Sequence, residues 1–207
     1  VTRDKVFALS NHSLFAVDKQ SEELSYYSRL TGLNGAVIST IGYNEALNLL
    51  LVCYDNGQLD VINAKEEIEN VPDLYLKQTN SSKVVNDICM HGHTAYLAMD
   101  FGILVLDMKK HEIKDTYIIG QDASEVSVKY ITTMGDSIYA VSPQLLYAAS
   151  LSDPLSDYAY WHSYSLPKGK QVTGLCAYDQ QLYIVRDNIL WFRNATQWQK
   201  QITTYPI

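Results

Sequence analysis

The amino-acid sequence predicts an all-β protein made of β-propeller blades, each blade being a four-stranded antiparallel meander. Three observations support this prediction. Short apolar runs are separated by turn signals, the same group of runs returns along the chain, and helical periodicity is absent. A group of four strands returning about every 40 to 50 residues is typical of propellers. We expect about five blades here, forming an incomplete part of a larger propeller.

The clearest example of the repeated group lies between residues 37 and 62. Three apolar runs follow one another, namely Val37–Ile41, Leu47–Cys53 and Leu59–Ile62. The turn Asp55–Gly57 separates the last two, and its Asn-Gly pair favours a tight hairpin because both residues tolerate a positive φ. The runs are rich in Val, Ile and Leu and too short for independent helices, so we expect three antiparallel strands.

A leucine near the start of each third strand sets the repeat length. These leucines are Leu14, Leu59, Leu104, Leu146 and Leu190, at spacings of 45, 45, 42 and 44 residues. In the second strand of each of the last four blades we expect one residue at an equivalent position, packed between neighbouring blades. These residues are Leu50, Tyr96, Tyr139 and Tyr183. A more polar fourth strand would close each blade and discourage pairing with other chains. The predicted blades of a single propeller are residues 5–35, 36–79, 80–125, 126–170 and 171–207.

The two ends of the sequence depart from the repeat. Only four residues precede Lys5, so the first unit lacks an inner strand, and Thr203–Ile207 is short for a closing strand. Unless that segment completes the first blade, apolar sheet faces would remain exposed at both ends of the array. We therefore expect an incomplete ring, completed by further sequence or by a second copy of the chain.

Composition excludes several classes of partner. The net charge is −7 and no basic stripe is present, so nucleic acid is not an expected partner. No run of about 18 apolar residues occurs, so we expect no membrane span in this chain. The three cysteines are odd in number and unsuited to a disulfide framework, and we expect Cys53, Cys89 and Cys176 to be small buried apolar residues.

No motif predicts catalysis or metal binding. The pair in His91-Gly92-His93 has no third ligand at a characteristic spacing. Asp55–Gly57 lacks the remainder of a calcium-binding loop, and no G-x-S-x-G nucleophile motif occurs. We therefore predict no catalytic residues, no metal and no cofactor. An enzyme at the propeller axis, such as a lyase or glycosidase, is a less favoured alternative to a binding module.

The turns between second and third strands are the candidate binding region. In a propeller they share one face with the connections between blades, and loops on a rigid scaffold are common binding sites. The candidate binding residues on that face are His12, Asn34, Asp55, Asn56, Asp100, Phe101, Arg186, Asp187 and Asn188.

Several segments, taken in order, resemble the propellers of PorZ-type proteins. The segments are Leu30–Asn34, Leu51–Val61, Ile68–Asp73 and Ala95–Ile103, and the resemblance covers roughly residues 5–165. The chain is also similar, more loosely, to the sensor propellers of bacterial hybrid two-component systems, which share the Gly-Leu motif between blades. The ordered matches indicate an extracytoplasmic propeller of Bacteroidetes.

The resemblance implies a function that the residues alone do not give. PorZ-type proteins belong to the surface attachment complex of type IX secretion and are implicated in recognising anionic lipopolysaccharide. It implies a noncatalytic scaffold in the periplasm or at the outer-membrane surface, with protein partners or a surface glycan. The alternative is a ligand-sensing periplasmic propeller of a hybrid two-component receptor, whose membrane segment and kinase would lie outside this sequence.

Overall fold

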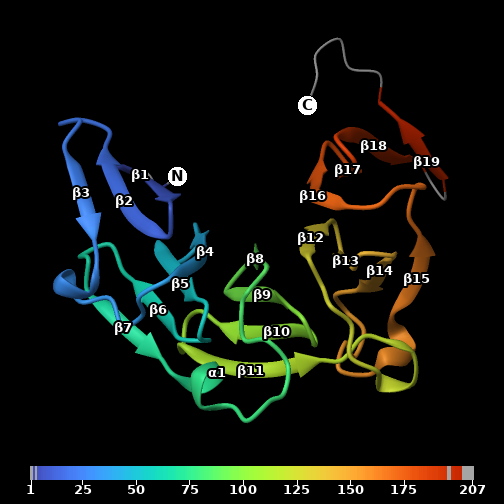
Figure 1. Ribbon diagram of the computed structural model, residues 1–207, viewed down its shortest axis with the longest axis horizontal. Helices are drawn as coiled ribbons and strands as arrows, with labels where there is room; N and C mark the ends of the chain where they lie inside the picture. The colour runs from blue at the N-terminus through green and yellow to red at the C-terminus, as the bar shows by residue number, and fades with distance from the viewer. Residues whose placement is uncertain (1, 3, 195–196, 202–207) are drawn as a thin grey trace. The chain divides into compact units, whose positions relative to one another are not determined.

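The computed structural model describes residues 2, 4–194 and 197–201. In this part of the chain the strands form five antiparallel sheets, and the only α-helix is the single turn α1 (Asp73–Leu76). Figure 1 shows the strands in chain order. The predicted all-β fold of propeller-type meanders is therefore confirmed.

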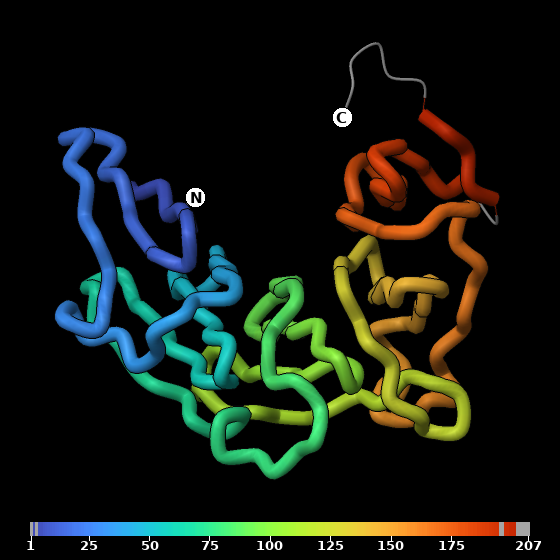
Figure 2. Tube along the Cα trace, in the orientation of Figure 1, coloured from blue at the N-terminus to red at the C-terminus, as the bar shows by residue number. Residues whose placement is uncertain are grey.

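Each sheet is formed by consecutive strands, as Figure 2 shows along the Cα trace. The first contains β1 (Lys5–Ser10), β2 (Ser13–Asp18) and β3 (Leu24–Tyr27). The second contains β4 (Ile38–Asn44), β5 (Leu49–Tyr54), β6 (Leu59–Ile62) and β7 (Ile68–Val71). The third contains β8 (Asp87–His91), β9 (Thr94–Met99), β10 (Gly102–Asp107) and β11 (Glu112–Tyr117). The fourth contains β12 (Tyr130–Met134), β13 (Ser137–Val141), β14 (Leu145–Ser150) and β15 (His162–Ser165), and the fifth contains β16 (Val172–Tyr178), β17 (Gln181–Arg186), β18 (Ile189–Asn194) and β19 (Gln197–Lys200).

The first sheet has three strands in the described residues, in agreement with the expected lack of an inner strand. The other four sheets have four strands each. The segment Thr203–Ile207, which could supply a closing strand, lies outside the described residues. Three short 3₁₀ helices, η1 (Arg29–Thr31), η2 (Gln121–Ala123) and η3 (Tyr158–Tyr160), lie in the connections.

The chain forms two compact units. The first comprises Val1–Met99 with Leu104–Asp115, and the second comprises Asp100–Ile103 with Thr116–Ile207. Whether the five predicted blade ranges behave as a single domain stays a prediction.

Each unit has an apolar core between neighbouring sheets. In the first, Leu14 of β2 packs in one cluster with Leu50 and Val52 of β5. In the second, Leu146 of β14 packs in one cluster with Leu182 of β17. All residues from Leu50 to Tyr54 are buried, so β5 is covered on both faces. Burial on both faces explains why this strand is a continuous apolar run without alternating polar residues.

The register of β5 corrects one prediction. Leu59 pairs with Cys53, and the equivalent Leu146 pairs with Val141. Two residues before Cys53 is Leu51, and two residues before Val141 is Tyr139, so Leu51 is the residue equivalent to Tyr139. The predicted equivalence of Leu50 with Tyr139 is therefore wrong by one residue. Since β5 is apolar on both faces, its sequence pattern does not distinguish one register from the next.

The hairpin turns also differ from one another. Asn11-His12 and Asp187-Asn188 are two-residue turns in which both residues have positive φ. In the turn after β5, only Gly57 has a positive φ, of 87°, and its N–H donates to the Tyr54 carbonyl at 3.2 Å. The expectation that Asn56 and Gly57 would share this conformation is therefore wrong for Asn56. The longer loop lets a single glycine provide the left-handed residue.

Candidate functional site

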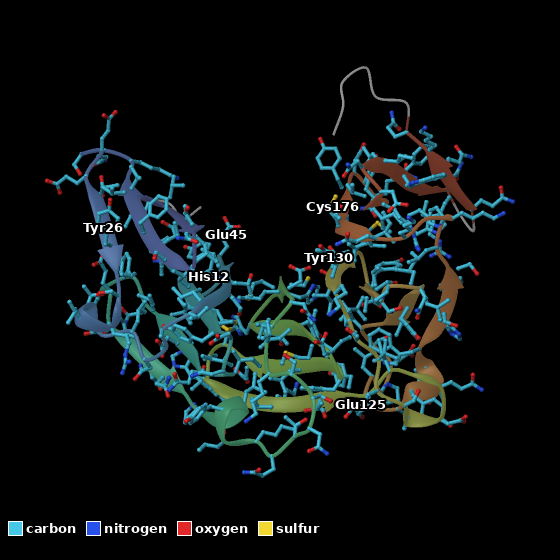
Figure 3. The ribbon with its side chains drawn as sticks, in the orientation of Figure 1. His12, Tyr26, Glu45, Glu125, Tyr130 and Cys176 are labelled. Atoms are coloured by element: carbon cyan, nitrogen blue, oxygen red, sulfur yellow. The ribbon has the colours of Figure 1, made fainter. Side chains whose placement is uncertain are left out.

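The nine candidate residues lie in both units, and eight of them lie in or beside turns between second and third strands. Asn34 is the exception, because it lies in the link between η1 and β4. The first unit contains His12, which Figure 3 labels, together with Asn34, Asp55 and Asn56, and the second contains Asp100, Phe101, Arg186, Asp187 and Asn188.

In the first unit, two hairpin turns bond to the start of β4. The Nδ1 atom of His12 lies 3.0 Å from the Ile38 carbonyl oxygen. The backbone N–H of Asp55 donates to the Val37 carbonyl at 3.0 Å. Asn56 bonds within its own turn, since its Oδ1 accepts from the N–H of Gln58 at 3.0 Å. All three of these side chains are exposed, but only that of His12 contacts another strand, through the carbonyl of Ile38 at the start of β4.

A buried carboxylate that the sequence analysis did not identify holds Asn34. Asp60 of β6 is fully buried and accepts from the N–H of Asn34 at 2.8 Å and from its Nδ2 at 2.9 Å. The hydroxyl of Tyr54 donates to the same carboxylate at 2.6 Å, and Nδ2 of Asn70 donates at 2.8 Å. Four donors satisfy a carboxylate that burial would otherwise destabilise. Asp60 therefore connects β6 to β5, to β7 and to the link that precedes β4.

The Tyr54 ring completes this arrangement. Burial raises the pKa of Tyr54, and its hydrogen bond to Asp60 raises it further, so the phenol stays protonated and can donate. Gly35 lies directly on the ring, because a Cβ atom added there would be 2.1 Å from Tyr54 Cδ1. The Asn34-Gly35 pair is therefore required for packing as well as for hydrogen bonding.

In the second unit, Asp100 holds the connection that leads to β12. Its Oδ1 accepts from Ser127 Oγ at 2.6 Å and from Lys129 Nζ at 2.5 Å. Phe101, beside it in the turn, is only 3% exposed. Both candidates therefore support the fold in this structure, Asp100 through its hydrogen bonds and Phe101 through burial.

The turn after β17 is fixed in a similar way. Arg186 is buried and donates through Nη2 to the Gly169 carbonyl at 2.5 Å. The carboxylate of Asp187 accepts backbone N–H bonds from Gln171 at 2.9 Å and Lys170 at 2.8 Å, which lower its pKa. Asn188 is exposed. Asp55, Asn56 and Asn188 are thus the exposed candidates whose side chains do not hold a link between strands.

The second unit also contains an aromatic cleft that the sequence analysis missed. Its volume is about 680 Å³, and none of the nine candidate residues lines it. Four aromatic residues do, namely Tyr147 of β14, Tyr158 of η3, Trp161 between η3 and β15, and Tyr164 of β15. Tyr164 pairs with Leu146 and packs in the cluster of β14 and β17, so its ring lies on the other face of the sheet from the Tyr147 ring. The signal for this cleft in the sequence is the density of aromatic residues between positions 158 and 164.

Two of these rings are fixed by contacts outside the cleft. Nε1 of Trp161 donates to the Leu155 carbonyl at 2.9 Å, and the residue is only 7% exposed. The guanidinium of Arg193 lies 4.1 Å from the centre of the Tyr164 ring, a cation–π contact. Tyr158, in contrast, is 37% exposed. The cleft therefore combines a rigid aromatic wall with one accessible ring.

Other predicted features have plain outcomes. Cys53 is buried and Cys89 half-buried, but Cys176, labelled in Figure 3, is exposed. The prediction that Cys176 is buried is wrong, because its side of β16 faces away from the core. Across the described residues, no three His, Cys, Asp or Glu side chains gather as a metal site, and no helix is long and apolar enough to cross a membrane.

Comparison with known proteins gives a consistent picture. The sequence profile of the family described as "TSS9, PorZ, N-terminal beta-propeller domain" matches residues 6–162. The structure is similar to PorZ of Porphyromonas gingivalis, with a TM-score of 0.86 and 28% identity over 100% of this chain and 28% of that one. A chain of the mitotic checkpoint complex matches with a TM-score of 0.67 and 12% identity, over 95% of this chain and 60% of that one, which shows the fold alone. No curated protein sequence matches.

Proposed function

The chain belongs to the family of PorZ N-terminal β-propeller domains, and we propose that it is a noncatalytic binding and scaffold module of a type IX secretion component. The observation that carries the proposal is the family match over residues 6–162. The similar protein of P. gingivalis is described as an essential bacterial surface component of that secretion system. This chain spans 28% of its length, so the proposal concerns the part that the propeller plays in such a protein.

The expected partners are proteins of the secretion apparatus or a surface glycan, and the expected location is the periplasm or the outer-membrane surface. The fold supports a scaffold role, because side chains such as Asp60 and Asp100 anchor the connections between strands. Rigid turns favour binding because less conformational freedom is lost when a partner docks. On the turn face, we propose that Asp55, Asn56 and Asn188 make contacts with partners.

The proposal is tested in the bacterium that encodes the protein. Deleting its gene should reduce secretion and surface attachment of type IX cargo, measured by fractionation and immunoblotting. The natural gene should restore both. Unchanged cargo secretion and attachment after deletion would contradict the proposed function.

A second arm tests the turn face. The double variant Asp55→Ala, Asn188→Gly removes two exposed side chains, and glycine is compatible with the φ of 60° at Asn188. In the deletion strain, this double variant should restore secretion less well than the natural protein does at equal abundance. A matched variant with alanine at the exposed Lys109 and Lys110, in a turn between third and fourth strands, should restore it fully. Full restoration by the first variant would exclude these residues as contacts while leaving the scaffold role intact.

A further inference from the structure

The aromatic cleft of the second unit has the composition of a binding site. We propose that it binds neutral sugar units of a glycan through stacking on Tyr158 and Trp161. This proposal rests on the proposed binding function, since it assigns one class of ligand to one site. The volume of the cleft, about 680 Å³, falls in the usual range of ligand pockets, roughly 300 to 1,000 Å³.

The apolar part of the site suits one face of a sugar ring. The C–H bonds on such a face are weakly positive and are attracted to the negative face of an aromatic ring. Tyr147 and Trp161 are 9% and 7% exposed, so they form a wall with little freedom to move. The partly exposed Tyr158 lies in η3 and can cover a bound ring from the solvent side.

The polar part of the site suits hydroxyl groups. Gln121 and Ser124, in and after η2, line the cleft together with Ser163 of β15, whose side chain lies on the same face of the sheet as Tyr147. All three side chains are exposed, and each can both donate and accept hydrogen bonds. The 3₁₀ helices η2 and η3 contact each other, so these polar groups and Tyr158 border the same space.

The charges of the site decide between classes of ligand. No Asp, Glu, Lys or Arg lines the cleft, so it has no fixed charge to neutralise a charged ligand. A purely apolar ligand would leave the amide and hydroxyl groups without partners. A proline-rich peptide also fits aromatic grooves, but it supplies few hydroxyl groups for this polar border. A neutral sugar matches both the aromatic wall and the hydroxyl-rich border.

The test uses the full chain and defined sugars. Maltohexaose, cellohexaose, mannohexaose and N-acetylchitohexaose are titrated by calorimetry, and saturation-transfer NMR identifies the sugar protons nearest the protein. At least one of the four should bind, with the strongest transfer to ring C–H protons. The variant Tyr158→Ala should bind it roughly tenfold more weakly, and Tyr158→Phe should bind like the natural protein.

Tyr160→Ala is the matched control. Tyr160 lies in the same 3₁₀ helix and is similarly exposed, at 40%, but it does not line the cleft. Its affinity should be unchanged. Circular dichroism spectra and melting temperatures of all variants establish that they are folded.

Three results would overturn the proposal. They are binding of none of the four sugars by the natural protein, equal binding by Tyr158→Ala, and Tyr158-dependent binding of a decaproline peptide with no sugar bound. Each leaves the secretion role to be judged by the gene deletion. Sugar binding that depends on Tyr158, in a protein whose deletion leaves secretion intact, would instead support the cleft and contradict the secretion role.

Discussion

Asp60 shows how much of this fold depends on single polar residues. The residue is fully buried within the otherwise apolar strand β6, and its carboxylate receives hydrogen bonds from Asn34, Tyr54 and Asn70. A buried charge is tolerated when enough donors surround it, but each donor then depends on it in turn. Removing the carboxylate would leave the Tyr54 hydroxyl and the Asn34 N–H without their partner.

We therefore expect Asp60→Ala to lower the free energy of unfolding by about 2 to 4 kcal/mol. Asp60→Asn should cost less, because the amide oxygen still accepts from part of the donor set. Asp55→Ala, at an exposed position five residues earlier, is the control and should change little. Urea titration followed by circular dichroism gives the three values. Similar values for Asp60→Ala and Asp55→Ala would show that the buried carboxylate contributes little.

Gly35 gives a second prediction at this scale. An added Cβ would be 2.1 Å from Tyr54 Cδ1, so Gly35→Ala forces the ring away from Asp60. We expect a loss of about 1 to 3 kcal/mol in unfolding free energy, as for other overpacked sites. At Gly174 the nearest side-chain atoms would be 3.9 Å from the new Cβ, so Gly174→Ala is the control and should be nearly neutral. The same urea titration decides, and a neutral Gly35→Ala would mean that the ring can move freely.

The sequence predicted these residues unevenly. The turn candidates were found because turn preferences are local, and positions such as Asp187-Asn188 do adopt left-handed φ values. Asp60 was not identified from the sequence, because nothing in the apolar segment around it indicates that donors from positions 34, 54 and 70 meet there. The aromatic cleft was missed for the same reason, since Tyr147 and Trp161 become neighbours only when β14 and the segment before β15 fold together.

At the scale of strands and turns, the third strands of the first three sheets each end in an Asp or Asn whose side chain organises the following turn. Oδ1 of Asp18 accepts from Gln20 N–H at 2.8 Å, Oδ1 of Asn63 from Lys65 N–H at 2.9 Å, and Oδ1 of Asp107 from Lys109 N–H at 2.9 Å. Asp and Asn favour such turns because their short side chains reach the backbone two residues ahead. This repetition explains why the third strands of these three sheets end in the same kind of turn.

The register within a strand was harder to predict, and Leu50 illustrates why. It packs with Leu14 of the first sheet, whereas Tyr139 packs with Val172 and Leu182 of the fifth. The two residues were expected to be equivalent, but the ladders place Leu51 at the position of Tyr139. Burial on both faces removes the alternation that normally fixes a register.

Leu50→Ala should still be costly, because the residue is only 4% exposed. We expect a loss of about 2 to 5 kcal/mol through the cavity that forms beside Leu14. Leu24→Ala, on the outer strand β3 and 48% exposed, should cost much less. Chemical denaturation of the two variants measures the difference. Equal losses would mean that the packing between the first two sheets does not stabilise the first unit as inferred.

For the whole molecule, the response to acid depends on carboxylates in both units. In the first unit, the backbone N–H groups of Ser21 and Gln20 lower the pKa of Asp18. The hydrogen bond from Lys5 lowers the pKa of Glu66. These groups are more easily ionised in the folded chain than in the unfolded chain, so folding favours their charged forms.

Asp187 gives the second unit the same dependence, through the backbone N–H groups described above. A folded-state pKa below the unfolded value, which is about 4 for these groups, stabilises the protein fully at pH values above that range. The contribution is lost as the pH falls through the folded pKa, so the urea midpoint should decrease between pH 7 and about pH 3. Asp18→Asn keeps an acceptor but has no carboxylate to protonate, so its midpoint should be lower at pH 7 and should fall less on acidification. Parallel pH profiles for this variant and the natural protein would contradict the assignment of Asp18 to the acid response.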